Sequence, residues 1–365
     1  MIRTRALTKD FVVSRTRTVH AVRGISLDVE PGELVAVLGP NGAGKTTTLR
    51  MLTTLIQPTS GTAEVAGYDV ADRPDRVRAA IGYVGQGGAG GAAQHVRDEL
   101  VTQGEIYGLD RRTARTRAAE LLEALDLTEQ ADRKVESLSG GQKRRLDVAV
   151  GLVHRPPLLF LDEPSTGLDP HNRANLWEHI LRMRTASAEP MTIVLTTHYL
   201  DEADTFAERV IVVDHGKVIA DDTADALKAD LAGDLVTLRV PAGQAATLAA
   251  IAERAPGTRS VRVADGAVRA TGQDDVDRTV EIRTADGPGA TPGLLRAADA
   301  AGVEVRRIDV ARPTLDDVFL GLTGRSLRET GVDGAGPGPD EPANSSTTNT
   351  SATTTSTTIK KEVPA

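Results

Sequence analysis

Short, wholly apolar runs divide the first two-thirds of the chain. Residues 34–38 and 158–161 are uninterrupted apolar runs, and residues 192–197 repeat the pattern with threonines added. Runs of this length are typical of strands that are buried on both faces, as in parallel sheets covered by helices. The pattern therefore predicts an α/β fold for this part of the chain.

The other segments before residue 225 have the periods of half-buried strands and amphipathic helices. Residues 1–33 alternate apolar and polar positions, which predicts an antiparallel sheet, and residues 209–219 have the pattern of a closing hairpin. Between residues 96 and 132 the apolar side chains recur with the helical period. We therefore expect an antiparallel β subdomain and a helical subdomain beside the central sheet.

The pattern changes near residue 225. Beyond it, strand-like and helical segments alternate at 235–240, 245–255, 261–270, 279–283, 294–301 and 303–310. This order predicts a small α+β domain. From about residue 326 the chain is rich in Gly, Pro, Ser and Thr and cannot bury a core, which predicts a disordered tail. We therefore divide the chain into domains at 1–225 and 226–325 and a tail at 326–365.

Residues Gly39 to Thr46, Gly-Pro-Asn-Gly-Ala-Gly-Lys-Thr, fit the pattern of a phosphate-binding loop. The loop lies between the predicted strand 34–38 and a predicted helix, which is the context that the motif requires. Its glycines let backbone N–H groups approach phosphate oxygens, and the helix N-terminus adds positive dipole. In this motif Lys45 contacts the β- and γ-phosphates and the Thr46 hydroxyl binds Mg²⁺.

Polar residues follow three other predicted strands, at 81–84, 158–161 and 192–197, on the sheet edge where ligands bind in open α/β folds. They are Gln86, the pair Asp162-Glu163, and His198. We expect Asp162 to hold Mg²⁺ through water and Glu163 to polarise an attacking water. His198 is predicted to contact the γ-phosphate, and Gln86 to contact Mg²⁺ or the attacking water.

A second candidate anion site is Leu138-Ser-Gly-Gly-Gln142, which precedes a segment with helical periodicity. Two glycines behind a serine at a helix start form an anion-binding terminus. Taken alone, Ser-Gly-Gly is also an ordinary helix cap. Five matching residues in order favour the anion-binding interpretation.

Composition narrows the class of protein. A net charge of −8 without long basic blocks argues against a nucleic-acid-binding protein, and the absence of cysteine excludes disulfides, thiolate metal sites and a cysteine nucleophile. No apolar run reaches the ~18 residues of a membrane span, and the first residues lack a signal-peptide pattern. We therefore expect a soluble cytoplasmic protein, with any membrane-spanning part in another chain.

In this order, the motifs resemble the ATP-binding subunits of ABC transporters over residues 1–225, and the Leu-Ser-Gly-Gly-Gln sequence separates that family from other phosphate-loop ATPases. The segment Pro313 to Phe319, followed by Gly324-Arg325, is similar to the daunorubicin/doxorubicin-resistance group of drug exporters. One departure is Gly85 to Ala93, where the family usually carries proline or bulkier residues. Residues 87–93 of this segment are Gly-rich and are predicted to form a flexible loop; in the family this loop contacts the membrane subunit.

The resemblance implies a role for each motif residue. Glu163, His198 and Gln86 are the catalytic set, and Thr46, Gln86 and Asp162 the Mg²⁺ set. The nucleotide-binding residues are Phe11, which stacks on the base, and Gly39, Pro40, Asn41, Gly42, Ala43, Gly44, Lys45, Thr46 and Thr47. The residues that act on a second copy are Leu138, Ser139, Gly140, Gly141 and Gln142. For Phe11, core packing is the alternative to base stacking.

The resemblance also implies a function and partners. The chain would bind ATP and Mg²⁺ and hydrolyse ATP to drive export of a drug, antibiotic or other hydrophobic compound through an integral membrane permease. The active form would be a two-fold homodimer in which the phosphate loop of one copy faces the signature of the other. It would lie at the cytoplasmic face of the cell membrane, without a nucleic-acid partner.

Three alternative functions remain open. They are the ATPase subunit of a polysaccharide exporter, that of a nutrient importer, and a soluble ABC ATPase outside transport. The acidic balance and single cassette weigh against the last. Sugar-binding surfaces usually stack rings on aromatic side chains, and Phe319 is the only aromatic residue after position 225.

The last predicted helix, residues 315–320, carries an apolar stripe beside the acidic pair Asp316-Asp317. The stripe has the helical spacing i, i+3, i+4, i+7 at Leu315, Val318, Phe319 and Leu322. One interpretation is that the stripe packs onto the small sheet of its own domain. We favour a role that needs this packing and adds to it, in which the helix holds the domain against a dimer mate or the membrane subunit.

Overall fold

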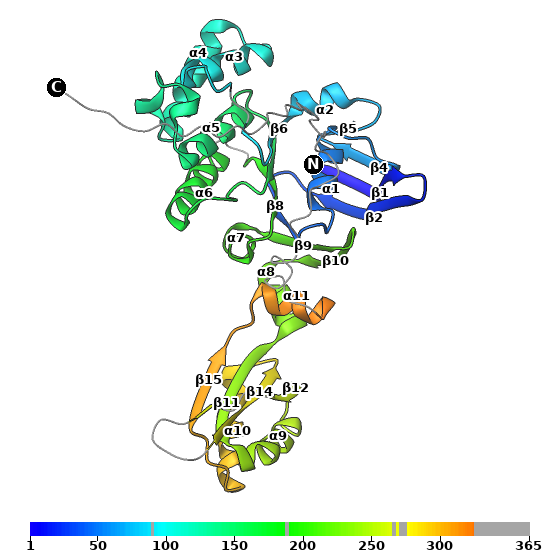
Figure 1. The fold of residues 1–365 in the computed structure, drawn as a ribbon, viewed down its shortest axis with the longest axis vertical. Helices are drawn as coiled ribbons and strands as arrows, with labels where there is room; N and C mark the ends of the chain where they lie inside the picture. The colour runs from blue at the N-terminus through cyan, green and yellow to red at the C-terminus, as the bar shows by residue number, and fades with distance from the viewer. Residues whose placement is uncertain (89–90, 187–189, 265–267, 270–275, 325–365) are drawn as a thin grey trace, which may run out of the picture. The chain divides into compact units, whose positions relative to one another are not determined.

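The computed structural model describes residues 1–88, 91–186, 190–264, 268–269 and 276–324 (Figure 1). The predicted tail at 326–365 lies outside the described residues, as do parts of the predicted Gly-rich loop and of the turn near residue 266. Within the described ranges, no helix has the length and apolar character needed to cross a membrane.

A six-stranded sheet lies at the centre of the fold. Its order is β10-β9-β3-β8-β7-β6, with every neighbouring pair parallel except the hairpin of β9 and β10. The strands are β3 (Leu34–Leu38), β6 (Ile81–Val84), β7 (Leu158–Asp162), β8 (Thr192–Thr197), β9 (Arg209–Asp214) and β10 (Lys217–Asp222). Every residue of β3, β7 and β8 is buried, so the prediction of strands buried on both faces is confirmed.

Two hydrophobic cores lie on opposite faces of this sheet. On one face, alternate strand residues such as Val35 and Val37 pack with α1 (Lys45–Leu52) and an antiparallel sheet of order β2-β1-β4-β5. That sheet comprises β1 (Ile2–Ser14), β2 (Arg17–Val29), β4 (Ser60–Val65) and β5 (Tyr68–Asp69), and α2 (Pro74–Ala80) follows it. The predicted antiparallel β subdomain is therefore confirmed.

On the other face, Leu34, Ala36 and Leu38 pack with helices. These helices are α3 (Val96–Ile106), α4 (Arg111–Ala124), α5 (Gly140–Leu152), α6 (Pro170–Arg184) and α7 (Leu200–Phe206), with short 3₁₀ turns at Thr128–Gln130 and Val135–Ser137. Because successive side chains of a strand point to opposite faces, a five-residue apolar strand serves both cores.

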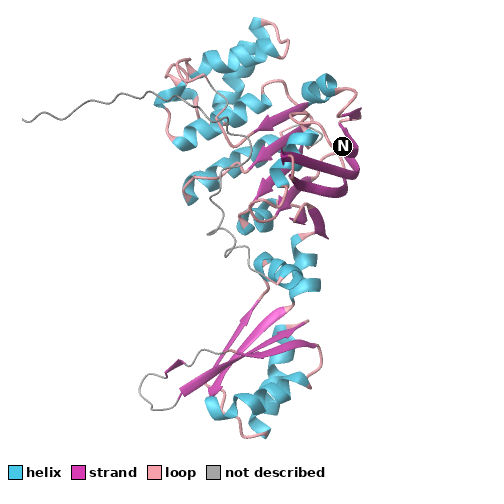
Figure 2. Ribbon diagram, turned by 45° about the vertical axis from the view of Figure 1, so that its right-hand side comes forward, coloured by secondary structure: helices cyan, strands magenta, loops and turns pink. Residues whose placement is uncertain are grey.

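The C-terminal sheet is antiparallel, with the order β12-β14-β11-β15 and with β13 paired to β14. Figure 2 shows its strands in magenta and the helices that pack against them in cyan. Its elements are β11 (Asp234–Pro241), α9 (Ala245–Glu253), β12 (Thr258–Val263), β13 (Val268–Arg269), β14 (Val276–Thr284), α10 (Gly287–Ala300) and β15 (Arg307–Ala311). Leu248 of α9 and Leu294 of α10 share a separate core with this sheet. The β-α-β-β-β-α-β order of these elements confirms the predicted α+β character.

Two boundaries in this region differ most from the sequence prediction. Helix α10 begins near Gly287 rather than Leu294, because the Asp286 side chain caps its N-terminus by accepting from Gly289 N and because proline is tolerated in the first turn. Strand β15 begins at Arg307, later than predicted.

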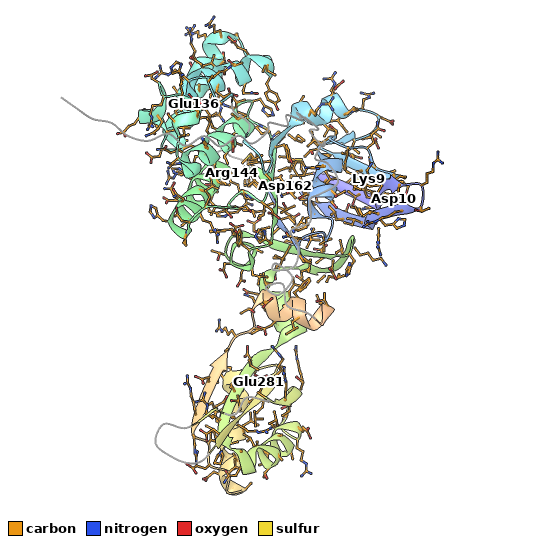
Figure 3. All side chains as sticks on the ribbon, in the orientation of Figure 1. Lys9, Asp10, Glu136, Arg144, Asp162 and Glu281 are labelled. Atoms are coloured by element: carbon orange, nitrogen blue, oxygen red, sulfur yellow. The ribbon has the colours of Figure 1, made fainter. Side chains whose placement is uncertain are left out.

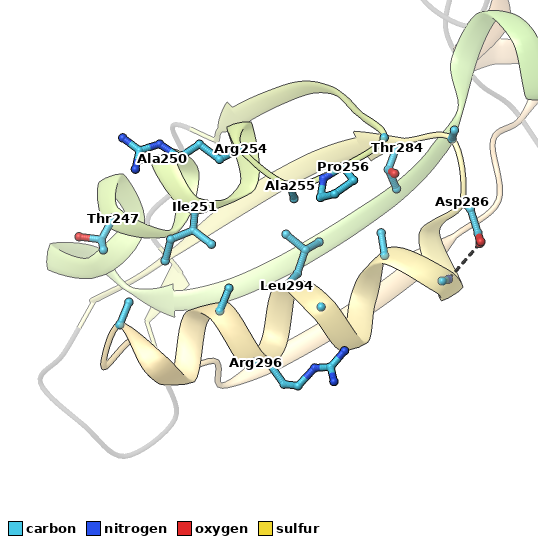
Figure 4. A pocket seen from close by; sticks show the side chains of 17 residues that line it. Thr247, Ala250, Ile251, Arg254, Ala255, Pro256, Thr284, Asp286, Leu294 and Arg296 are labelled. Atoms are coloured by element: carbon cyan, nitrogen blue, oxygen red, sulfur yellow. Dashed lines mark hydrogen bonds between the residues drawn. The ribbon is translucent and has the colours of Figure 1, made fainter.

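Between α9 and α10 lies an open groove of about 850 Å³, lined mainly by small and apolar side chains such as Ile251 and Leu294 (Figure 4).

Helix α11 (Leu315–Thr323) packs differently from either prediction. Its residues Leu315, Val318 and Phe319 are buried in the core that α3 to α7 share, and not in the core of the C-terminal sheet. The helix contacts α7, α8 (Ala224–Leu227) and the turn Lys228–Ala232. Packing onto its own small sheet was therefore the wrong interpretation. Because the stripe is already covered within the chain, a dimer mate or membrane subunit cannot use it without displacing the helix.

Candidate functional site

The phosphate-loop motif joins the end of β3 to the start of α1, as predicted. A Cβ atom on Gly39 would lie 2.2 Å from the Val213 carbonyl oxygen, and one on Gly44 would lie 2.5 Å from that of Ala21. Gly44 also has a φ of 103°, which L side chains rarely adopt. Glycine is therefore required at both positions by close backbone approach.

Lys45 is the first residue of α1 and is 5% exposed. Its Nζ donates to the carbonyl oxygens of Gly39 and Pro40, at 2.8 and 3.1 Å, and lies 3.7 Å from Glu163 Oε1. Burial lowers the pKa of Lys45, although the charges of Glu163 and Asp162 oppose this shift. An anionic group beside Lys45 would therefore offset the cost of burying the ammonium.

Asp162 ends β7 and is 1% exposed. Its Oδ1 accepts from Thr46 Oγ1 at 2.9 Å and from Thr196 Oγ1 at 2.6 Å. Gln86 Nε2 lies 3.5 Å from Thr46 Oγ1. The structure thus brings together the three predicted Mg²⁺ residues. A hydroxyl, an amide and a carboxylate are hard oxygen ligands of the kind that Mg²⁺ takes alongside phosphate and water, so the residues fit the ion.

Glu163 and His198 also lie at this edge of the sheet. His198 Nδ1 is 3.3 Å from Glu163 Oε2 without hydrogen-bond alignment, and Thr166 Oγ1 donates to Oε2 at 3.2 Å. Burial opposes ionisation of Glu163, but the adjacent His198 and the Lys45 charge outweigh it and hold the pKa of the carboxyl below its usual value. The side chain is therefore an ionised carboxylate beside the Lys45 ammonium.

The signature residues form the predicted helix start. Ser139 caps α5, accepting from Gln142 N at 3.3 Å, and Gln142 Oε1 accepts from Ser139 N at 3.0 Å. Ser139 and Gly140 are exposed, whereas Leu138 and Gly141 are buried. None of the hydrogen bonds and ion pairs described for the phosphate-loop cluster includes a signature residue, so the two motifs occupy separate helix N-termini of a single chain.

The remaining predicted nucleotide-binding residues lie on or near the loop, except for Phe11. Asn41 is exposed, Thr47 is half-buried, and the Ala43 carbonyl accepts from Gly216 N at 2.9 Å. Phe11 lies half-buried on β1, outside the three hydrophobic cores, with Lys9 Nζ 5.2 Å from its ring centroid. Core packing is therefore the wrong interpretation for Phe11, and none of the site contacts described above includes it.

Sequence reasoning missed Arg144, which is 8% exposed on the signature helix α5. Its guanidinium donates to the carbonyl oxygens of Gly85 at 2.6 Å, Asp162 at 3.3 Å and Glu163 at 3.4 Å, and also to that of Pro164. Arg144 and Asp162 are labelled in Figure 3. Burial lowers the pKa of Arg144, and the charge of Asp147 opposes this shift. One rigid side chain thus fixes the backbone beside Gln86 and around Glu163.

Thr196 is the second residue that the sequence did not single out. Besides holding Asp162, its hydroxyl accepts from Glu163 N at 3.1 Å, and its carbonyl accepts from the same N–H. Its position on a buried strand was the only signal in the sequence, because threonine is common in strands.

Taken together, the site residues place an ammonium group, oxygen ligands for a metal and a carboxylate at one edge of the sheet. These are the groups required for transfer of a phosphoryl group to water.

Protein-family models match two parts of the chain. The ABC transporter model matches residues 22–166, and a model of the C-terminal domain of DrrA1-3-like ATP-binding proteins matches residues 223–323. Among curated relatives, daunorubicin resistance ATP-binding protein DrrA2 of Streptomyces coeruleorubidus is 44% identical over 85% of this chain and 92% of the relative. Daunorubicin/doxorubicin resistance ATP-binding protein DrrA of Streptomyces peucetius is 39% identical over 88% of this chain and 93% of the relative's length.

A further relative matches a shorter part of the chain. Nod factor export ATP-binding protein I of Burkholderia orbicola (strain AU 1054) is 41% identical over 60% of this chain and 72% of the relative. Among solved structures, the dimeric post-hydrolysis state of the ATP-binding cassette MJ0796, bound to ADP and Pi, is 25% identical with a TM-score of 0.56. The match covers 61% of this chain and 98% of the MJ0796 chain.

Proposed function

Because this chain belongs to the family of ABC transporter ATP-binding proteins, we propose that its hydrolysis of ATP drives export of a drug or antibiotic through a separate membrane subunit. As a member of that family, the chain binds ATP and is an ATPase. The observation that carries the export proposal is that relatives named for drug resistance match both the N-terminal part and the C-terminal region. The Nod factor export relative covers 60% of this chain, whereas the relatives named for drug resistance cover 85% and 88%, so drug export is favoured over the alternative functions.

Binding starts at the phosphate loop. Its N–H groups and the α1 N-terminus receive the phosphate oxygens, and Lys45 contacts the β- and γ-phosphates. Thr46, Gln86 and Asp162 would hold Mg²⁺, which when bound supplies positive charge to neutralise phosphate oxygens. Thr196 keeps Asp162 oriented by its 2.6 Å hydrogen bond. Phe11 is proposed to stack on the nucleobase.

Hydrolysis then uses Glu163 and His198. Glu163 takes a proton from a water molecule as the water oxygen bonds to the γ-phosphorus and the bond to the β–γ bridging oxygen breaks, which gives ADP and inorganic phosphate. The depressed pKa of Glu163 keeps the carboxylate ready to accept that proton. His198, 3.3 Å from Glu163, is proposed to contact the γ-phosphate and to orient the carboxylate.

The remaining proposals concern assembly and organisation. The exposed Ser139 and Gly140 terminus is proposed to close over the nucleotide of a second copy in a two-fold homodimer, and the solved MJ0796 cassettes are dimers. We place this dimer against an integral membrane permease at the cytoplasmic face of the membrane. We also retain the division at residues 225 and 325, which the separate core of the C-terminal sheet and the family matches support.

The test is efflux in cells. The chain is expressed in a drug-sensitive bacterium with a candidate membrane subunit encoded beside its gene, and intracellular daunorubicin fluorescence is followed. We expect lower accumulation with the wild-type pair than with the Glu163→Gln pair or either protein alone. If accumulation is the same in all strains while the purified chain hydrolyses ATP, the ATPase assignment stands and the export proposal is wrong.

A further inference from the structure

A buried carboxylate that the proposed reaction does not use lies next to the site. Glu202 is on α7, four residues after His198, and is 1% exposed. Burying an ionised carboxylate is costly unless hydrogen bonds compensate for the lost water. The partners of Glu202 therefore show what this charge holds in place.

Three side chains donate hydrogen bonds to Glu202. Ser165 Oγ and Trp177 Nε1 both donate to Oε1, the latter at 3.2 Å, and Thr197 Oγ1 donates to Oε2 at 2.8 Å. Arg173 Nε lies 3.8 Å from Oε1 as an additional positive charge. The carboxylate is thus satisfied on both oxygens, by bonds of the charge-assisted kind that are stronger than neutral ones.

Two of these donors belong to segments that carry site residues. Ser165 lies two positions after Glu163, and Thr197 is the last residue of β8, directly before His198. The third donor, Trp177, is on α6, is fully buried and stacks on Phe206 with ring centroids 4.7 Å apart. Glu202 therefore ties two segments of the site to one fixed point in the core.

The segment after Glu163 also reaches the signature helix. Asp169 ends the loop that contains Ser165 and caps α6 by accepting from Asn172 N at 2.9 Å. The Asn172 side chain packs against Gly141 so closely that a Cβ there would lie 2.6 Å from its Oδ1. The loop 164–169 therefore leads from Glu163 to α6, and Asn172 of α6 packs against the helix that carries the signature.

We propose that Glu202 is a positioning residue that couples the loop 164–169 to His198, so that Glu163 and His198 reach the reactive geometry together. The proposal rests on the proposed roles of Glu163 and His198 in hydrolysis. A change at the γ-phosphate contact of His198 would move Thr197, and through Glu202 it would move Ser165 and the loop that leads toward the signature. Trp177 takes no part in this link and only anchors the carboxylate.

The test compares two variants that each remove one hydrogen bond to the same oxygen. Ser165→Ala removes the bond on the site side, and Trp177→Phe removes the bond on the core side. We expect Ser165→Ala to lower kcat about tenfold, the size of effect that one charge-assisted hydrogen bond produces, with the Kd of a fluorescent ATP analogue changed less than about twofold. Trp177→Phe should lower the Tm but keep kcat within about twofold. A purely structural Glu202 would instead give losses of kcat that follow the losses of Tm.

A double-mutant cycle completes the test. If the effect of Ser165 passes through Glu202, adding Ser165→Ala to Glu202→Gln should lower kcat less than it does in the wild-type background. Additive effects, or an unchanged kcat in Ser165→Ala, would overturn the proposal. Glu163→Gln is assayed in parallel. If that variant hydrolyses ATP normally, the catalytic roles themselves are wrong; if it is inactive and the Ser165 and Trp177 variants behave alike, only the Glu202 proposal fails.

Discussion

Glu163 has a φ of 47°, a left-handed conformation that is unfavourable for a residue with a side chain. Three groups hold it there: Thr196 accepts from its N–H, Arg144 donates to its carbonyl, and His198 faces its carboxylate. At this scale the backbone and side-chain angles of Glu163 are restrained by partners on β8, on α5 and in the segment directly after β8.

The first prediction concerns this carboxylate. Glu163→Gln keeps the side-chain shape but cannot accept the proton from water, so kcat should fall by about 10²–10⁴, while ATP affinity is retained. Lys45→Ala should lower both kcat and the affinity for ATP, because it removes a phosphate contact that is made in the bound state and during the reaction. Steady-state hydrolysis and equilibrium binding of an ATP analogue measure the two effects. Normal turnover by Glu163→Gln would contradict the role given to this residue.

At the scale of elements, α11 connects two parts of the chain through different faces. Its apolar face is buried with α7 and α8, whereas Asp317 pairs with Arg283 of β14 in the C-terminal sheet. The helix N-terminus is a capping box, in which Thr314 Oγ1 accepts from Asp317 N and Asp317 Oδ2 accepts from Thr314 N. The same carboxylate thus starts the helix and ties it to the sheet.

The second prediction concerns the apolar face. Because the Phe319 ring is fully buried, Phe319→Ala should cost about 3–5 kcal/mol locally and release α11 without a comparable loss of ATP affinity. Leu320→Ala is the matched control, since Leu320 is on the same helix but is 42% exposed. Thermal unfolding and limited proteolysis near residue 315 measure the release. Equal stability of the two variants would show that the stripe does not hold the helix.

The third prediction concerns the polar face. Burial opposes ionisation of Asp317, but the Thr314 N–H and the Arg283 guanidinium outweigh it and hold the pKa of this carboxyl below its usual 3.8. Its ionised form therefore stabilises the fold above that value, and this contribution disappears as the pH falls through 3.8 to the lower folded-state pKa.

Asp317→Asn should accordingly lower the free energy of unfolding by about 1 kcal/mol at neutral pH, and the difference from wild type should shrink as the pH falls below about 4. Denaturant titrations at pH 7 and pH 3.5 provide the comparison, with the exposed Asp299→Asn as control. A difference that does not depend on pH would assign the effect to shape and not to charge.

At the scale of the whole molecule, the helix termini that carry the phosphate loop and the signature lie on different elements and share none of the described contacts. The phosphate loop starts α1, and the signature starts α5. One chain therefore supplies half of each of two sites if two copies meet head to tail, which a two-fold axis achieves with identical contacts. ATP would then be the ligand that holds the pair closed.

The fourth prediction follows from this arrangement. With Glu163→Gln blocking hydrolysis, saturating Mg-ATP should shift the chain from monomer to dimer, and adding Ser139→Arg should prevent the shift by placing bulk and charge at the γ-phosphate contact. Ser137→Arg adds the same side chain two residues earlier, outside the signature, and should leave the dimer intact. Sedimentation velocity gives the result. A monomer at saturating Mg-ATP in the Glu163→Gln protein would count against the shared site.

Much of the fold and site was predictable from the sequence because those signals are local. The phosphate loop, its strand and its helix are contiguous in the sequence, and the backbone conformation of the loop requires the glycines that define the motif. Wholly apolar runs such as Leu34–Leu38 mark strands buried on both faces wherever they pack. The order of Gln86, Asp162 and His198 after successive strands then placed them at one edge, since parallel strands end on the same side.

Only the tertiary structure decided which distant groups complete the site and what covers each apolar face. The periodicity of α11 required one buried face, but it contained no information about the surface that buries it, and that surface proved to be α7 and α8. The same holds for the hydrogen bonds of the site. The partners that Arg144 bonds lie 18 to 59 positions away in the sequence, those of Thr196 lie 33 to 34 positions away, and those of Glu202 lie 5 to 37 positions away. Hydrogen bonds across such separations depend on how the sheet and helices pack, which no local pattern specifies.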